Sequence, residues 1–371
     1  LPNNIHVTRS FNFQQGFDWF NYQAPDYIAG ATESSSQLSM YNVVRKLRDK
    51  LVGGKKRVED YYQPADFVFG NAQKFISANK DKRWFTFVHL MEPHDPYFER
   101  PFTGEGIGRA EMPNPPPELE GEMRKAYQQE ITWMDNEIGK FLDWIKSEGL
   151  YDDTVVVVTA DHGEEFLEHG GWWHGTTLYE EQIHVPLIVK LADGQWGGTR
   201  VPWQVRGIDI APTITAALNL SADNSWEGQN LLSEAALLAL SAPSQVGSDC
   251  VSSREHPLDR IVVAENNFEG NVLSSLRMRG FKYITANEDN NRNLKAEELY
   301  DITSDTVEQK NIAGQTTPIC EQSTEGHQKL LKAVLGETIN ASLQTAVNAS
   351  GVELDEATIQ KMKALGYMTD E

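Results

Sequence analysis

Segment 159–189 holds the residues whose types and spacing are best suited to chemistry. It contains four histidines and several carboxylates, and it directly follows the apolar run at 155–158. At its start, Asp161 and His162 place a carboxylate oxygen beside an imidazole, a donor pair that suits divalent Zn, Mn, Mg or Ca ions. The alternative interpretation is that Asp161 caps a helix and His162 is a polar surface residue. The two residues alone leave both interpretations open.

The same segment carries three further histidines. His174 follows two tryptophans, and apolar walls around an imidazole hold the ring in place and tune its pKa. His169 and His184 are interpreted as structural hydrogen-bonding residues. Glu164 or Glu165 would accept a hydrogen bond from the imidazole of His162 and orient that ring towards a metal ion.

A second histidine-bearing loop is expected at 91–97. Prolines on both sides of His94 stiffen the backbone, so the side chain can be aimed. The loop follows the run 84–90, which predicts a buried strand, and the run 154–159 predicts another strand in a mainly parallel sheet. Both loops would therefore lie at the carboxyl ends of strands, where doubly wound α/β folds bind their ligands.

The rest of the chain predicts two domains. These are an α/β core at 1–235 and a small C-terminal α+β subdomain at 255–371, with a loop-rich boundary between them. Other predicted elements are a helix through Tyr127 and Ile145 that ends at Gly149, a strand at 185–190, a helix at 212–220, an antiparallel meander at 260–265, 272–278 and 281–286, and a last helix at 354–365.

Composition and charge exclude several classes of function. The 371 residues include 33 basic and 54 acidic ones, and the net charge of −21 argues against a nucleic-acid partner. No apolar run is long enough to predict a membrane span. Because the net charge is negative, an anionic substrate needs a local positive centre, which a bound metal ion would supply. Cys250 and Cys320 are too few for a disulfide scaffold or a cysteine-rich zinc module, and their pairing stays open.

The chain begins with Leu1 and shows no signal segment, so we expect it to have been processed or cut from a longer one. Asn-x-Ser triplets at Asn219, Asn340 and Asn348 fit a periplasmic or extracellular protein.

Several stretches together resemble the sulfatases of the alkaline-phosphatase superfamily. They are FVHLMEPHDPY, VVVVTADHGEEFLEHGGWWHGTTLYEEQIHVPLIV, IDIAPTI and ELYDITSDTVEQKNIA, and the resemblance runs from about residue 17 to KALGY near the end. One departure is Thr306, where the family usually has proline. The resemblance implies a mainly parallel sheet flanked by helices, followed by a small antiparallel sheet and helix. It also implies a metal-dependent hydrolase of sulfate esters.

The resemblance assigns roles to the residues already described. Asp161 and His162 resemble the second pair of metal ligands, for one divalent ion that is Ca or Mg in the family, with Zn or Mn as alternatives from the residue types. His94 resembles the histidine that contacts the ester and protonates the leaving oxygen, and His174 takes the place of a residue that binds the sulfate or phosphate oxygens. These roles agree with metal-assisted ester chemistry.

Aromatic residues beside the two loops could line a pocket for a small-molecule or carbohydrate sulfate ester. Tyr97 and Trp173 are the candidates, although such residues are as often part of the core.

Two features of the family are expected to be missing. An acidic metal-binding pair and the nucleophile (a cysteine converted to formylglycine, or a serine or threonine) lie upstream of the GFD segment, which begins here at Gly16. We therefore expect a chain without its N-terminal portion, which could act as a partner segment. The stretch from Cys250 to Arg254 has the outline of the nucleophile pattern, but it follows the metal motif instead of preceding it. We do not expect it to be the nucleophile.

Two alternative functions stay open. One is a phosphodiesterase, phosphonate hydrolase or phospho-group transferase of the same superfamily, because an Asp-His pair also occurs at their metal sites. The other is a non-catalytic remnant or one piece of a two-chain protein.

Overall fold

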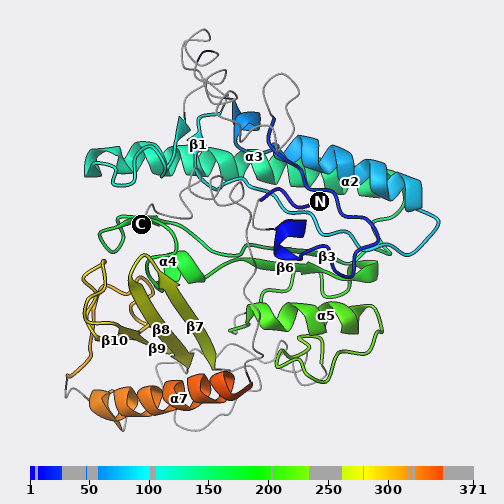
Figure 1. Cartoon of the computed structure of the whole chain (residues 1–371). Helices are drawn as coiled ribbons and strands as arrows, with labels where there is room; N and C mark the ends of the chain where they lie inside the picture. Colours follow the sequence, from blue (N-terminus) through cyan, green and yellow to red (C-terminus); the bar gives the residue numbers. More distant parts are fainter. Residues whose placement is uncertain are drawn as a thin grey trace. The chain divides into compact units, whose positions relative to one another are not determined.

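A computed structural model of the protein describes most of the chain (Figure 1). The described residues are 1–4, 7–26, 47, 57–100, 106–201, 204–233, 261–278, 280–315, 318–319 and 322–345. They fall into two compact units, one within Leu1–Gly149 and the other within Leu150–Asn348. The predicted domain boundary after residue 235 lies outside the described residues, so the division into 1–235 and 255–371 stays a prediction.

The first unit is built on two helices, α2 (Ala65–Asn79) and α3 (Glu120–Ser147), which lie side by side in Figure 1. Their aromatic rings interlock, with Phe69 and Phe141 stacked at 4.6 Å between ring centroids. The predicted helix is confirmed as α3, and Gly149 follows it with a φ of +70°, the conformation that glycine adopts most easily after a helix.

The face that α3 buries differs from the predicted apolar stripe. Glu130 is fully buried, while Ile131 of the stripe is 38% exposed. The reason is that Glu130 accepts hydrogen bonds from the Phe98 amide and from the Arg100 guanidinium. Periodicity identifies apolar faces, and it cannot reveal a carboxylate that is buried with its partners.

The prediction of a strand at 84–90 is wrong, because these residues do not form a strand in the structure. The segment is extended and bonds with Leu1, whose terminal amine donates to the Phe87 carbonyl and whose carbonyl accepts from His89. Phe85 and Phe87 are 58% and 46% exposed. A strand needs a continuous ladder, and one neighbouring residue cannot supply it.

Short elements complete the first unit. They are the 3₁₀ turns η1 (Arg9–Phe11), η4 (Val58–Asp60) and η5 (Pro117–Leu119), and the antiparallel pair β1 (Tyr97–Phe98) and β2 (Gly106–Ile107).

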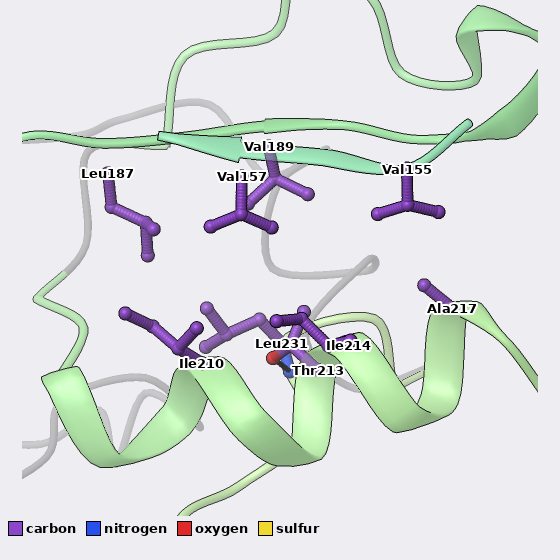
Figure 2. A pocket seen from close by; sticks show the side chains of 9 residues that line it. All are labelled: Val155, Val157, Leu187, Val189, Ile210, Thr213, Ile214, Ala217 and Leu231. Atoms are coloured by element: carbon purple, nitrogen blue, oxygen red, sulfur yellow. Dashed lines mark hydrogen bonds between the residues drawn. The ribbon is translucent and has the colours of Figure 1, made fainter. Parts of the chain in front are cut away.

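The second unit begins with β3 (Val156–Thr159) and β6 (Leu187–Lys190), which confirm two predicted strands. They pair antiparallel, with Val157 opposite Val189. The helix α5 (Ile210–Ala217) covers one face of this pair, which confirms the predicted helix close to its expected position (Figure 2).

Two details of this layer differ from the prediction. The pairing of β3 in the described residues is antiparallel, and Ile188 on β6 is 61% exposed, so β6 is not covered on both faces. Apolar β-branched runs occur in either kind of ladder, so residue types alone do not fix strand direction.

The gap between these strands and α5 is a packing gap in the core. Apolar side chains, with Thr213, line a cavity of about 10 Å³ (Figure 2). Substrate pockets measure about 300–1,000 Å³. This cavity is therefore too small to hold a substrate.

The C-terminal part of this unit is a four-stranded antiparallel sheet in the order β10-β9-β8-β7. The strands are β7 (Val262–Phe268), β8 (Asn271–Met278), β9 (Phe281–Ala286) and β10 (Glu297–Asp301). The helix α7 (Thr324–Thr345) packs on it through Leu331 and Leu335, against Leu276 and Tyr283. The predicted meander is confirmed.

Two elements of this region escaped prediction. The strand β10 reads EELYD, in which charged residues hide the alternation, and α7 is interrupted by glycines and polar residues. The predicted helix at 354–365 lies outside the described residues.

The remaining described elements of the unit are short: β4 (Glu165–Phe166), β5 (Trp172–Trp173), α4 (Glu180–Ile183), η6 (Ala192–Gly194), η7 (Gly207–Asp209), β11 (Pro318–Ile319) and β12 (Gln322–Ser323). Among the helices that the structure describes, none has the length and hydropathy to cross a membrane.

Candidate functional site

The candidate site begins where β3 ends. The side chain of Asp161 is 80% exposed, and its Oδ2 lies 3.9 Å from Nε2 of His162. Its other oxygen accepts a hydrogen bond from the His162 amide at 3.1 Å. No helix starts at Asp161 in this part of the described chain, so the helix-cap interpretation is wrong.

Gly163 fixes the direction in which the chain leaves this pair. Its amide donates to the Gln182 carbonyl at 2.7 Å, and the next amide, of Glu164, donates to the Glu181 carbonyl at 2.9 Å. A Cβ on Gly163 would lie 2.1 Å from the Glu181 carbonyl oxygen. Only glycine allows the two backbones to approach so closely, and the approach sets the position of His162.

His174 lies against His162. The two rings stack with their centroids 4.1 Å apart. His174 is only 8% exposed, and its Nδ1 lies 3.1 Å from a buried oxygen of Glu164. The structure therefore brings together Asp161, His162 and His174.

The predicted orienting carboxylates have other roles. Glu164 holds His174, whereas the Nδ1 of His162 donates to the adjacent Gly163 carbonyl at 2.8 Å. Glu165 is fully buried and forms an ion pair with Arg292 at 2.8 Å. The expectation that one of these carboxylates orients the imidazole of His162 is wrong, because the Gly163 carbonyl accepts the hydrogen bond from its Nδ1.

His94 belongs to the other unit. Its amide donates to the Met91 carbonyl at 2.6 Å, and its Nδ1 donates to the Asp95 carbonyl at 2.7 Å. The Asp95 carboxylate in turn accepts from the Arg109 amide at 2.8 Å. Hydrogen bonds therefore fix this loop in addition to its prolines.

The three candidate histidines share one arrangement. In His94 and His162 the Nδ1 faces the carbonyl of the next residue, and in His174 it faces the Glu164 carboxylate on the other side of the β4–β5 hairpin, so Nδ1 carries a proton and donates it. The chemistry of each ring therefore falls to Nε2, which can bind a metal or exchange a proton.

His169 is held through both ring nitrogens, as expected of a structural residue. Its Nδ1 contacts Glu181 at 2.7 Å, its Nε2 contacts the Glu308 carbonyl at 3.0 Å, and its ring stacks on Tyr179. Burial alone would lower the pKa of His169, but the hydrogen bonds to Glu181 and to the Glu308 carbonyl raise it above its ordinary value. His184 is 68% exposed and lies 3.4 Å from Glu180.

The two aromatic candidates are buried. Tyr97 is 1% exposed and packs its ring edge-on against Tyr127, and Trp173 is 2% exposed within the β4–β5 hairpin. Burial does not support a role in lining a substrate pocket for either residue. Cys250, the rejected nucleophile candidate, lies outside the described residues, as does Cys320.

A buried carboxylate beneath the His94 loop was not expected from the sequence. Glu92 is 2% exposed, and its Oε1 accepts from the Ala65 amide at the start of α2 at 2.9 Å. Burial raises the pKa of Glu92 to about 7, while its hydrogen bond with Ala65 opposes that rise. Arg100 lies 3.8 Å away but pairs more closely with Glu130, at 2.8 Å.

Asp161 and His162 are suitable donors for a divalent ion. A separation of 3.9 Å is what two ligands of one cation show when each lies about 2–2.5 Å from it. Among the residues that the structure describes, no group of three His, Cys, Asp or Glu side chains forms a metal site. By itself the pair would supply only part of a coordination shell.

Comparison with known proteins places these residues in context. The sequence model of the family described as Sulfatase matches residues 4–220. A low-salt glycan biosynthesis sulfotransferase, Agl7, from Haloferax volcanii is 31% identical over 35% of this chain and 32% of its own length. A choline-sulfatase from Rhizobium meliloti is 24% identical over 54% of this chain and 35% of its own. The matched part of the chain thus spans about a third of the length of each of these relatives.

Solved structures show the same fold. The protein BT4656, solved with D-glucosamine-2-N,6-O-disulfate, has a TM-score of 0.53 at 17% identity, over 76% of this chain and 71% of that one. A phosphonate monoester hydrolase from Agrobacterium radiobacter has a TM-score of 0.51 at 19% identity, over 76% and 62%. These similarities confirm the predicted α/β fold class with its small C-terminal antiparallel sheet.

Proposed function

Because the chain belongs to the sulfatase family, we propose that the protein hydrolyses sulfate esters with the help of a divalent metal ion. The described residues would supply one half of the active site. The observation that supports this most is the shared arrangement of His94, His162 and His174. Each ring is fixed through Nδ1, so its chemistry would take place at Nε2.

The metal ion would be held in part by Asp161 and His162. Ca or Mg is what the family favours, while an imidazole ligand also suits Zn or Mn. A bound ion polarises the oxygens of the ester and stabilises the negative charge that develops during displacement. It also supplies the local positive centre that a chain of net charge −21 needs for an anionic substrate.

The two other histidines act on the ester. His174, held by Glu164, would donate a hydrogen bond from protonated Nε2 to a sulfate oxygen. His94, held by Asp95, would give a proton to the departing alcohol oxygen. The nucleophile and the remaining metal ligands are not among the residues that the structure describes.

A carbohydrate sulfate ester is the substrate class that we propose. It is supported by the fold shared with a protein solved with a sulfated glucosamine. The phosphonate monoester hydrolase of the same fold supports the second candidate, a phosphonate or phosphate ester hydrolase. We also propose a periplasmic or extracellular location, which agrees with the Asn-x-Ser triplets.

Paired substrates would test the proposal. Turnover of an aryl sulfate and of the matching aryl phosphonate should favour the sulfate, and chelation should abolish it until Ca, Mg, Mn or Zn is returned. Titration with Mn²⁺ should show weaker binding by D161N, and H184Q, at the exposed His184, is the control. A preference for the phosphonate would support the second candidate. Unchanged Mn²⁺ binding by D161N would contradict the metal site, and a protein without either activity would support the non-catalytic alternative.

A further inference from the structure

The backbone that carries His174 is held from the C-terminal sheet. Glu165, one residue after the partner of His174, is fully buried on β4. Its two oxygens accept from Arg292 at 2.8 and 2.9 Å, and Arg292 lies in the connection between β9 and β10, 127 residues away. This paired geometry is the strongest that a guanidinium and a carboxylate form.

Arg292 also contacts the chain on both sides of His174. Its Nη1 donates to the Thr176 hydroxyl at 2.5 Å, and its Nη2 donates to the His169 carbonyl at 3.3 Å. A Cβ on Gly171 would lie 2.2 Å from the guanidinium carbon. Arg292 therefore packs directly on the β4–β5 hairpin that precedes His174.

A second link runs through Gln182 on α4. Its Nε2 donates to Glu165 at 2.9 Å, and its Oε1 accepts from the Gly175 amide at 2.9 Å, directly after His174. On the other side of the same residue, Asn266 of β7 donates to the Gly175 carbonyl at 2.7 Å. The C-terminal sheet thus reaches the histidine loop at several points.

We propose that Arg292 is a positioning residue for His174. It fixes the loop at 171–177 through Glu165 and Thr176, so that His174 meets Glu164 and stacks on His162. Its role in turnover rests on the proposed function. The placement of the imidazole does not, since it can be measured without substrate.

Selective ¹⁵N labelling of histidine would test this in the full chain, with the His174 signals assigned by comparison with H174Q. We expect R292M to shift or broaden the His174 and His162 ring signals. The matched control is R206M. Arg206 also pairs with a fully buried carboxylate, that of Asp209 at 3.0 Å, but it does not touch the loop. R206M should lower the melting temperature to a similar extent and leave the histidine signals in place.

A second variant covers the case in which R292M does not fold. G171A retains every charge and places a methyl group against the guanidinium, and Gly171 does not have the left-handed backbone that alanine would resist. It should shift the His174 signals in the same way. Unchanged signals in R292M and G171A, or equal shifts in R206M, would show that Arg292 only stabilises the fold and would overturn the proposal.

Turnover adds a separate measurement. If the protein hydrolyses a sulfate ester, R292M should lose about 10–100-fold in kcat/KM, as residues that orient a reacting group usually do. R292K keeps the charge without the paired geometry and should recover only part of the loss. A wild-type protein without turnover would contradict the proposed function, while the histidine signals would still decide the role of Arg292.

Discussion

Glu92 lies two residues before His94 and combines full burial with few hydrogen-bond donors. The pKa of its carboxyl is raised to about 7 by burial, against an ordinary value near 4.3 in an unfolded chain. Between these two pKa values, the Glu92 carboxyl is protonated in the folded protein and ionised in the unfolded chain. Stability from this group is present at low pH and is lost as the pH rises towards 7.

We expect the free energy of unfolding to fall between about pH 4 and pH 7, and E92Q should remove that part of the slope. The full effect is at most about 4 kcal/mol, because the pKa rises from about 4.3 to about 7 and one pKa unit corresponds to about 1.4 kcal/mol. Urea denaturation at several pH values measures it. An unchanged slope in E92Q would mean that another group titrates.

Gly163 is a second residue at which a small change should have a large effect. In G163A, the new methyl group would meet the Glu181 carbonyl oxygen at 2.1 Å, which forces the two backbones apart. We expect a loss of about 1–3 kcal/mol in stability and weaker binding of Mn²⁺, because His162 moves with the backbone.

The control for G163A is G139A on α3, where a methyl group meets nothing within 4 Å. It should be neutral or stabilising by up to about 1 kcal/mol. If the two variants unfold at the same urea concentration, the close approach at Gly163 does not constrain the site.

Among the elements, the four-stranded sheet is joined to α4 by buried charges. Lys282 on β9 has no exposed side-chain area, and its Nζ lies 2.9 Å from Glu308 and 3.1 Å from Glu180. Arg277 adds a second contact to Glu180 at 2.5 Å. Burial raises the pKa of Glu308 even though Lys282 opposes this. The cluster depends on every member being present.

K282M should therefore destabilise the protein by about 3–5 kcal/mol, as expected when one partner of a buried pair is removed. K332M is the matched control, because Lys332 is 61% exposed and pairs with Glu297 at the surface. That change should cost about 0–1 kcal/mol. Thermal and urea unfolding measure both, and equal small losses would show that water reaches Lys282.

Local patterns predicted the elements better than the contacts between them. The strand β9 and the helix α3 follow from runs and spacings of apolar residues, and so does β3. The segment at 84–90 has the residue types of a strand, but its ladder depends on neighbours that no local pattern describes. The donor pair Asp161 and His162 could be predicted because the two residues are neighbours in the sequence.

Arg292 could not be predicted in this way. Its partner Glu165 lies 127 residues away in the sequence, and no spacing rule connects a loop between two strands of one sheet to a hairpin in another. The same holds for Glu130, which is buried beside Arg100, 30 residues earlier in the sequence. Residue types say least about buried polar contacts between residues that are far apart in the sequence.

At the scale of the whole molecule, the net charge of −21 opposes every anionic substrate. Long-range repulsion slows the approach of an anion, and salt screens it over about 10 Å at 0.1 M. We expect kcat/KM for an aryl sulfate to rise about two- to threefold between low and physiological ionic strength. The melting temperature over the same range is the control. A fall in kcat/KM with salt would show that a positive site entrance dominates the field.

The long sequence separations around the histidine loop also determine when it can form. Ribosomes deliver chains from the N-terminus, and domains fold as their residues emerge. The strands β3 and β6 can pair once residue 190 has emerged, but Glu165 waits for Arg292, and His169 waits for the carbonyl of residue 308. Until then the nascent chain carries a carboxylate that has no counter-ion to accompany it into the core. The histidine loop therefore cannot make all its contacts before residue 308 has been synthesised.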